Sequence, residues 1–193
     1  MSVRAAFYFD LRSPEAYLAA ERALSVLPAP CEWRPILSSM LPHAESFEAY
    51  RCESEAGIMR ENVERRAAQL DLLPLRWPDP FPFDSRFAML AATYAKRIGK
   101  TVGFALAAFR QAYAGGRSLD DHEHVLIAAA ACEIHPAALL RATGTRGVAA
   151  ALERESAGAV ALGVTDVPAV TVGDRVLVGE RSLEEAAELL ARA

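Results

Sequence analysis

The fold is decided by residues 5–24, which read AAFYFDLRSPEAYLAAERAL. The first five of them are apolar or aromatic, and a run of this length predicts a buried strand. The residues that follow Ser13 are rich in Ala, Leu and Glu and predict a helix. Ser13 stands at the expected N-cap and Pro14 at the first helical position, which are the places that serine and proline prefer. A short turn ending at Ser13 therefore joins the strand to the helix.

The strand and helix are the first two parts of a βαβ unit. Pro28 and Pro30 end the helix, and residues 31–37 then read as a second strand. Two strands joined through a helix in this way should be parallel and lie in one sheet.

The end of the chain returns to strands. Residues 167–172 and 175–178 are rich in valine and are separated by a Gly-Asp pair, which predicts a β-hairpin. After them, Ser182 and Glu185 are spaced as a capping box, which predicts the start of a last helix.

The middle of the chain shows mostly helical patterns. A proline-rich joint at 73–83 interrupts them, because no helix tolerates so many prolines. Residues 85–98 and 102–113 predict helices. Residues 125–132 are apolar almost all round and predict the buried helix of this region.

The order of elements is βαβ, then helices, then ββα, which is a thioredoxin-like fold with an insertion between its halves. We therefore expect an α/β protein in which residues 1–37 and 160–193 form a discontinuous thioredoxin-like domain. Residues 38–159 would form an inserted all-helical domain.

Bulk properties exclude several classes of function. The chain has 193 residues, 52% of them hydrophobic and 24% charged, as in an ordinary soluble globular protein. Its net charge of -4 argues against nucleic-acid binding. No segment is long and apolar enough to predict a membrane span. The four histidines lack the spacing of a metal site. The odd, scattered cysteines form no CxxC pair and favour a reducing cytoplasm; they are Cys31, Cys52 and Cys132.

The candidate chemistry starts at Ser13. A thioredoxin-like fold places its reactive sulfur at the mouth of the first helix, where backbone amides and the helix dipole favour an anion. Here that position holds a serine, which is a poor nucleophile without an adjacent base but a good hydrogen-bond donor. We expect Ser13 to donate to the thiolate of a bound cofactor. The alternative is that Ser13 only caps the helix.

A second feature is Val167-Pro168, directly before a predicted strand. In this topology it would be a cis-proline loop that faces the helix mouth, and the Val167 backbone could pair with an extended, peptide-like ligand. The alternative is that Pro168 only marks the boundary of the strand. The aromatic residues Trp77, Phe81 and Phe83 either line a hydrophobic substrate pocket or fasten the proline-rich joint to the core.

Several motifs together resemble a known family. They are FYFDLRSP at 7–14 with YLA at 17–19, WRP at 33–35, FPFDS at 81–85, GVTDVP at 163–168 and GER at 179–181. In order and spacing they resemble the 2-hydroxychromene-2-carboxylate isomerases and the related kappa-class glutathione transferases of the DsbA-like superfamily.

The resemblance implies a glutathione-dependent isomerase, usually a homodimer, that acts on a hydrophobic aromatic-ring degradation intermediate. Ser13 would be the catalytic residue that holds glutathione, or another low-molecular-weight thiol, as a thiolate. The thiolate adds to a conjugated double bond, the bond rotates, and elimination gives the trans product. Further cofactor contacts would come from Val167, Pro168, Glu180 and Arg181, and substrate contacts from Arg34, Trp77 and Phe81.

The chain also departs from the family pattern. Glu15 stands where an aromatic residue is common, and residues 38–43 read SSMLPH in place of an asparagine-rich, double-proline loop, with Arg60 and Asn62 as loose substitutes. Three other functions stay open: a kappa-class-like transferase or peroxidase, a non-catalytic thioredoxin-fold binding module and, disfavoured by the missing CxxC, a thiol-disulfide oxidoreductase.

Overall fold

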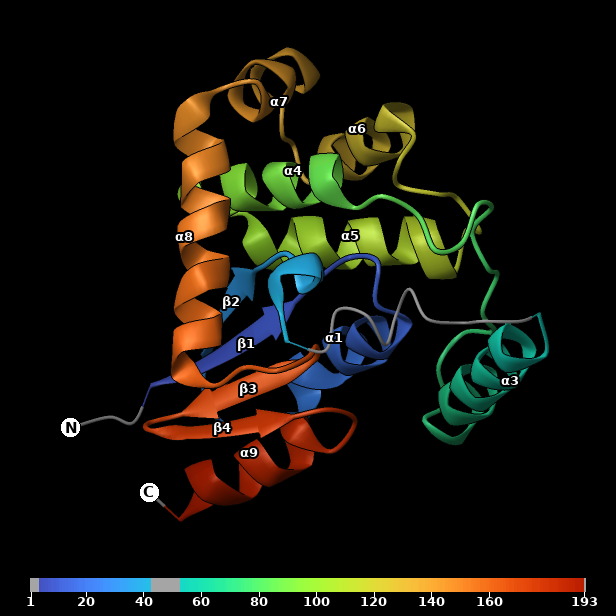
Figure 1. The fold of residues 1–193 in the computed structure, drawn as a ribbon, viewed down its shortest axis with the longest axis vertical. Helices are drawn as coiled ribbons and strands as arrows, with labels where there is room; N and C mark the ends of the chain where they lie inside the picture. Colours follow the sequence, from blue (N-terminus) through green and yellow to red (C-terminus); the bar gives the residue numbers. More distant parts are fainter. Residues whose placement is uncertain (1–3, 43–52, 193) are drawn as a thin grey trace.

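A four-stranded mixed sheet forms the centre of the computed structural model, which describes residues 4–42 and 53–192 (Figure 1). The strand order is β2-β1-β3-β4, with β1 (Ala5–Phe9) parallel to β2 (Cys31–Pro35). The third strand, β3 (Ala169–Val172), runs antiparallel to both β1 and β4 (Arg175–Val178). Helix α1 (Pro14–Val26) connects β1 to β2. The predicted βαβ unit and hairpin are both confirmed.

The central strand β1 is buried on both faces. Side chains alternate along a strand, so Phe7 and Phe9 point to one face and Tyr8 to the other. The first face packs against α1 and α9 (Ser182–Ala191), and the second against α8 (Arg146–Leu162). Because each face is covered, the strand is apolar throughout instead of alternating with polar residues.

The inserted helices follow β2 and a short 3-10 turn, η1 (Ser38–Met40). Helices α4 and α5 lie beside the sheet with α6 and α7 beyond them, while α3 lies next to α1 (Figure 1). Their bounds are α3 Glu53–Gln69, α4 Arg86–Arg97, α5 Thr101–Tyr113, α6 His122–Ala131 and α7 Pro136–Thr143. Within the described ranges, no helix combines the length and apolarity that crossing a membrane requires.

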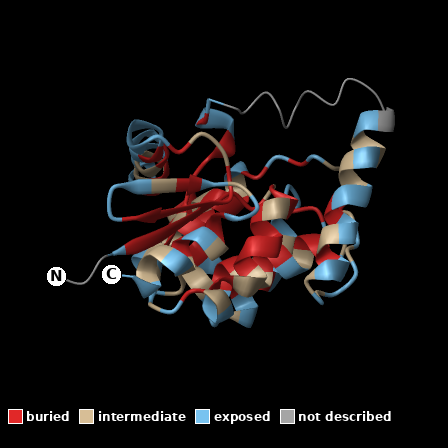
Figure 2. Cartoon of the chain, turned by 90° about the horizontal axis from the view of Figure 1, so that it is seen from below, coloured by how far each residue is buried: buried red, intermediate tan, exposed pale blue. Residues whose placement is uncertain are grey.

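The sheet and the insertion share one continuous buried core (Figure 2). Its link is Phe109 of α5, whose ring centroid lies 5.9 Å from that of Phe9 in β1 and 6.1 Å from that of Tyr17 in α1. The predicted domain boundaries at residues 37 and 160 stay a prediction. The side chain of Phe109 nevertheless packs the insertion against the thioredoxin-like part.

The prediction that residues 125–132 form the buried helix of the insertion is wrong. Helix α6 covers most of this segment, yet Ile127 is 46% exposed, while Phe104 and Phe109 of α5 are fully buried. A helix that is apolar all round carries no period that tells which face is inside. One face of α6, with Val125, Ala128 and Ala129, is buried, whereas Ala130 and Ala131 are exposed; the larger rings of α5 fill the core.

The predicted capping box at Ser182 is also wrong. Ser182 is the first residue of α9, Arg181 is its N-cap, and the Glu185 N–H donates to the Arg181 carbonyl. The buried Ser182 hydroxyl has no hydrogen-bond partner among the described residues. The helix therefore begins one residue earlier than the capping-box spacing predicts.

The end of α8 gives a first testable prediction. Gly163 closes the helix in the left-handed region, with φ of +94°. Gly163→Ala should lower the free energy of unfolding by about 1 kcal/mol, because a Cβ disfavours that conformation. Gly158→Ala, within the same helix at an open position, should instead raise it by about 0.5–1 kcal/mol. Urea unfolding measures the change in the free energy of unfolding of each variant. Two changes of the same sign would contradict the assignment of a left-handed cap to Gly163.

Candidate active site

Ser13 lies at the mouth of α1, as predicted, and is only 1% exposed. Its Oγ accepts the Ala16 N–H at 3.1 Å, which confirms the N-cap, and Pro14 is the first residue of the helix. The single hydroxyl proton has two acceptors, Glu15 Oε2 at 3.2 Å and the Val167 carbonyl at 3.5 Å. Neither bond is short, so the proton can turn to a better acceptor placed at the same mouth.

The loop opposite Ser13 carries the peptide bond that the sequence singled out. The Val167-Pro168 bond is cis, and the Val167 carbonyl faces the Ser13 hydroxyl. The Val167 N–H donates to the side chain of Asp166 at 2.7 Å. The Pro168 carbonyl accepts the Gly179 N–H at 2.8 Å, which fastens this loop to the turn that bears Glu180. Two loops from the C-terminal half thus meet the start of α1.

Asp10 holds this turn in place, and the sequence reasoning missed it. Its carboxylate is 1% exposed and accepts three hydrogen bonds, from the Arg12 N–H at 3.1 Å and from the N–H and hydroxyl of Ser38, each at 2.8 Å. The Ser13 N–H also donates to the Asp10 carbonyl. One side chain therefore ties the end of β1 to both the Ser13 turn and η1. The available signal was an acidic residue directly after a buried apolar run.

Three carboxylates gather near Ser13. Burial raises the pKa of Glu15, and the nearby carboxylates of Asp166 and Glu180 raise it further, while hydrogen bonds from its own backbone and from Ser13 work in the opposite direction. Glu180 forms an ion pair with Arg66 of α3. The Glu15 carboxylate contacts Ser13 directly, because the Ser13 hydroxyl donates to its Oε2.

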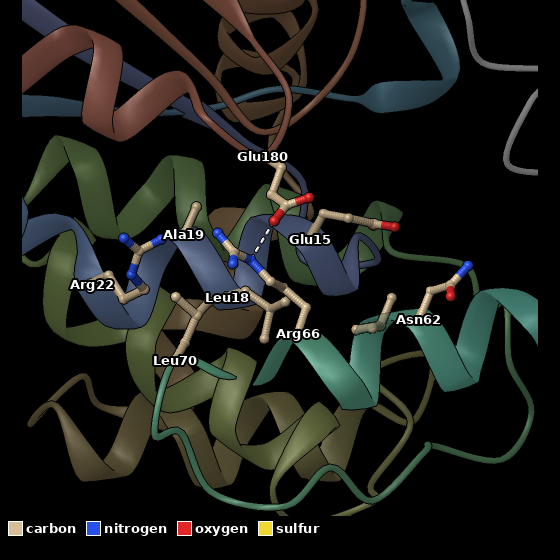
Figure 3. Close-up of a pocket in the computed structure, with 9 residues that line it drawn as sticks. Glu15, Leu18, Ala19, Arg22, Asn62, Arg66, Leu70 and Glu180 are labelled. Atoms are coloured by element: carbon tan, nitrogen blue, oxygen red, sulfur yellow. Dashed lines mark ion pairs between the residues drawn. The ribbon is translucent and has the colours of Figure 1, made fainter. Parts of the chain in front are cut away.

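A pocket of about 510 Å³, counted with its part open to solvent, lies between α1 and α3 (Figure 3). Its walls are apolar and its rim is charged, with the Arg66–Glu180 ion pair across it. The lining residues are Glu15, Leu18, Ala19, Arg22, Asn62, Val63, Arg66, Leu70 and Glu180.

A second pocket, of about 820 Å³ by the same measure, is lined in part by Arg12, the residue before Ser13. It runs between the end of β2 and the start of α4. Its lining residues are Arg12, Leu37, Ser39, Pro82, Phe83, Asp84, Ser85 and Arg86. Glu15 lines the first pocket and Arg12 the second, so each pocket borders a residue close to Ser13 in sequence, while Ser13 is not among the described residues that line either pocket.

Trp77 and Phe81 lie behind the Ser13 turn. Their ring centroids are 4.9 Å apart, and both rings pack against Tyr113, whose hydroxyl donates to the Arg12 carbonyl at 2.6 Å. The Arg60 guanidinium lies over both rings. Neither Trp77 nor Phe81 is among the described residues that line the two pockets. These contacts match the alternative in which the aromatic joint is fastened to the core, and a role in substrate binding stays a prediction.

The structure places Arg34 away from the other predicted residues. From β2 it pairs with Glu155 of α8 at 3.0 Å and with Glu32 at 2.7 Å, and its guanidinium lies over the Tyr8 ring. Tyr8 belongs to the opposite face of the sheet from Tyr17 of α1. The contacts of Arg34 thus bind α8 to the sheet and do not bring it to Ser13.

The remaining predicted residues divide between the pocket and the surface. Glu180 and Asn62 line the pocket between α1 and α3, whereas Arg181 is exposed at the start of α9. Arg60 lies over the aromatic joint. Of the cofactor contacts that the sequence suggested, the structure therefore brings Ser13, Val167, Pro168 and Glu180 to one region.

The described cysteines are not poised for thiol chemistry. Burial raises the pKa of Cys31 to about 12, with Glu32 adding to the effect, and burial also raises the pKa of Cys132. Cys52 lies outside the described residues, as does His43. In the described ranges there is also no group of three or more His, Cys, Asp or Glu side chains able to hold a metal ion.

The raised pKa of Cys31 predicts slow labelling. In a variant with Cys52→Ser and Cys132→Ser, a thiol reagent at pH 8 should modify Cys31 at least about 100-fold more slowly in the native protein than in denaturant. The reason is that only the thiolate reacts, and burial disfavours it. Equal rates in the two states would show that Cys31 is accessible and ionises normally.

Three comparisons relate this geometry to known proteins. The sequence model of the family described as DSBA-like thioredoxin domain matches residues 5–191. A 2-hydroxychromene-2-carboxylate isomerase has a similar structure, with a TM-score of 0.84 and 16% identity over 97% of this chain and 94% of that one. No curated protein sequence matches the chain significantly.

Two other solved structures are similar over nearly the whole chain. A probable DsbA oxidoreductase from Streptomyces coelicolor has a TM-score of 0.79 and 18% identity, covering 98% of this chain and 89% of that one. The cytosolic disulfide reductase DsbM from Pseudomonas aeruginosa, solved with GSH, has a TM-score of 0.67 and 15% identity, covering 98% and 96%. At these identities the structures show a shared fold.

Proposed function

Because the chain belongs to the DSBA-like thioredoxin domain family, we propose that it is a thiol-dependent cis-trans isomerase of the 2-hydroxychromene-2-carboxylate type. Its cofactor is glutathione or another low-molecular-weight thiol, and Ser13 holds the cofactor sulfur as a thiolate. The observation that carries the proposal is a buried serine hydroxyl, without a neighbouring cysteine, at the helix mouth opposite the Val167-Pro168 loop.

The residues around Ser13 fit such a cofactor. The bonds from the Ser13 hydroxyl to Glu15 at 3.2 Å and to the Val167 carbonyl at 3.5 Å are long, so it can turn to a sulfur anion at the mouth of α1. The backbone N–H groups of the first turn and the helix dipole favour a negative charge at the same place. The Val167 carbonyl accepts a 3.5 Å contact from Ser13 and has a second lone pair that can accept an amide N–H of a peptide-like ligand.

The protein's own residues position the cofactor sulfur and the substrate. When bound, the thiolate supplies a nucleophile that adds reversibly to a conjugated double bond and so allows rotation about it. Ser13 fixes the position of the sulfur, and Asp10 fixes Ser13 through the turn. The pocket on the Arg12 side, with Leu37 and Phe83 as apolar walls and two arginines, suits a planar hydrophobic acid.

The resemblance also implies a homodimer in the cytoplasm, and both belong to the proposal. A disulfide oxidoreductase function is less well supported, because the described cysteines, Cys31 and Cys132, lie in β2 and after α6 and have raised pKa values. In the part of the chain that the structure describes, no cysteine stands at the start of α1.

The test is product analysis with 2-hydroxychromene-2-carboxylate, in the presence of glutathione, of S-methylglutathione, or of neither. We expect conversion to the trans isomer only with the free thiol. A chlorinated aromatic compound and an organic peroxide should be poor substrates by comparison. Fast conjugation or peroxide reduction would indicate the transferase alternative. Glutathione binding with no turnover of any substrate would favour a binding module.

A further inference from the structure

Glu15 is a half-buried carboxylate in the first turn of α1, directly beside the proposed sulfur site. Its Oε2 lies 3.2 Å from Ser13 Oγ, and its side chain lines the pocket between α1 and α3 (Figure 3). The group that would donate to the sulfur therefore already donates to a carboxylate. This contact raises the question of where the thiol proton goes.

Two anions at one helix mouth would repel each other strongly. The start of α1 compensates for about half of one elementary charge, which is enough for one anion but not for two. Two acids only a few ångströms apart titrate as a pair, and the first ionisation opposes the second. A thiolate beside an ionised Glu15 is thus disfavoured, whereas a thiolate beside a protonated Glu15 carries one negative charge in total.

We propose that Glu15 accepts the proton of the cofactor thiol through Ser13 and keeps it while the sulfur is anionic. This step rests on the proposed function. The S–H bond breaks with its electron pair remaining on sulfur, and an O–H bond forms on Glu15 Oε2. Ser13 passes its own proton to Glu15 and takes up the thiol proton, so its own protonation state is unchanged. The reverse transfer restores the thiol when the cofactor leaves.

The surroundings of Glu15 raise its affinity for a proton, while in the free protein its Oε2 accepts the Ser13 hydroxyl. Burial is the largest cause of its raised pKa, and acids on two other loops add to it. Tyr113 of α5 also faces it, and burial raises the pKa of that phenol well above its usual range, so it stays neutral. The charged or titratable groups that interact with Glu15 or line its pocket are Arg22 of α1, Arg66 of α3, Tyr113 of α5, Asp166 before β3 and Glu180 after β4. Arg66 is engaged by Glu180, which limits its ability to hold Glu15 ionised.

Counting protons on glutathione binding tests this transfer without relying on turnover. Calorimetric titrations at pH 7.5 in buffers of different ionisation enthalpy give the protons released per cofactor, and ultraviolet difference absorbance gives the thiolate formed. At this pH a free thiol, with a pKa of about 8.5, is still mostly protonated. The wild type should form thiolate while releasing well under half a proton. Glu15→Gln should release about one proton for each thiolate formed. Glu15→Asp keeps a carboxylate and should again release well under half a proton.

The outcomes separate the two proposals. Thiolate absorbance in the wild type with about one proton released would overturn the role of Glu15 and leave the thiolate at Ser13 standing. Glutathione binding without thiolate absorbance would overturn the proposed function, and the transfer to Glu15 with it. Because the wild type alone gives both results, the test holds even if a Glu15 variant fails to fold.

Discussion

Replacing Ser13 by alanine should lower the turnover of the proposed thiol-dependent isomerase reaction by about 100-fold or more. Removal of one hydrogen-bond donor to a developing anion commonly costs a factor of about 100 to 1000 in kcat. Ser13 is the side-chain donor at the mouth of α1, and its hydroxyl is buried. The pKa of bound glutathione, followed by thiolate absorbance against pH, should rise toward that of the free thiol in the variant.

Controls separate the hydroxyl from the helix cap. Ser13→Ala also removes the bond to the Ala16 N–H, which costs about 1 kcal/mol of stability. Ser13→Gly loses the hydroxyl at a smaller capping cost and should be as inactive, while Ser13→Thr keeps the hydroxyl and should retain most activity. Ser25→Ala, at an exposed position at the other end of α1, should behave as wild type. Normal thiolate formation in Ser13→Gly would refute the assignment of Ser13.

The second large effect is expected at Asp10. Asp10→Ala should lower the free energy of unfolding by about 3 kcal/mol or more. The substitution removes the acceptor of two buried donors, the N–H and hydroxyl of Ser38, and of the partly buried Arg12 N–H, and each buried unsatisfied group costs about 1–3 kcal/mol. The midpoint of urea unfolding measures the change, provided that the slope with urea concentration is unchanged.

The matched control is Ser38→Ala. This variant removes one of the three bonds and keeps the Ser38 N–H bonded to Asp10, so its loss should be about 1 kcal/mol. The Ser13 turn is also less ordered without Asp10, so Asp10→Ala should lose thiolate formation as well as stability. Equal stability losses in the two variants would mean that Asp10 contributes only through the Ser38 hydroxyl.

Much of the fold could be predicted because its signals are local. The apolar run that ends at Phe9, the Ser13-Pro14 helix start and the Gly-Asp turn each reflect backbone preferences of a few adjacent residues. Their order along the chain then admits few topologies. The prediction failed where local signals were ambiguous, as in α6, whose uniform apolarity does not indicate which face is buried.

The candidate site could be predicted only in outline. Ser13 and the Val167-Pro168 loop followed from the fold and the family resemblance, since the topology itself brings the helix mouth and the loop together. Arg34 illustrates the limit: its neighbours in sequence resemble the family's second strand, but its guanidinium is held by Glu155, which lies 121 residues later. Sequence spacing does not show which partner a long side chain will find.

The sequence by itself therefore determined the strands, the helix that starts at Ser13 and the chemistry possible at its mouth, because these depend on short-range backbone and capping energies. Only the tertiary structure decided which groups surround that mouth. Asp10 meets Ser38, and Glu15 contacts Ser13 and feels the charges of Asp166 and Glu180, which follow it by more than 150 residues in sequence. Proton affinity and burial depend on these distant neighbours, so they arise only when the chain is packed.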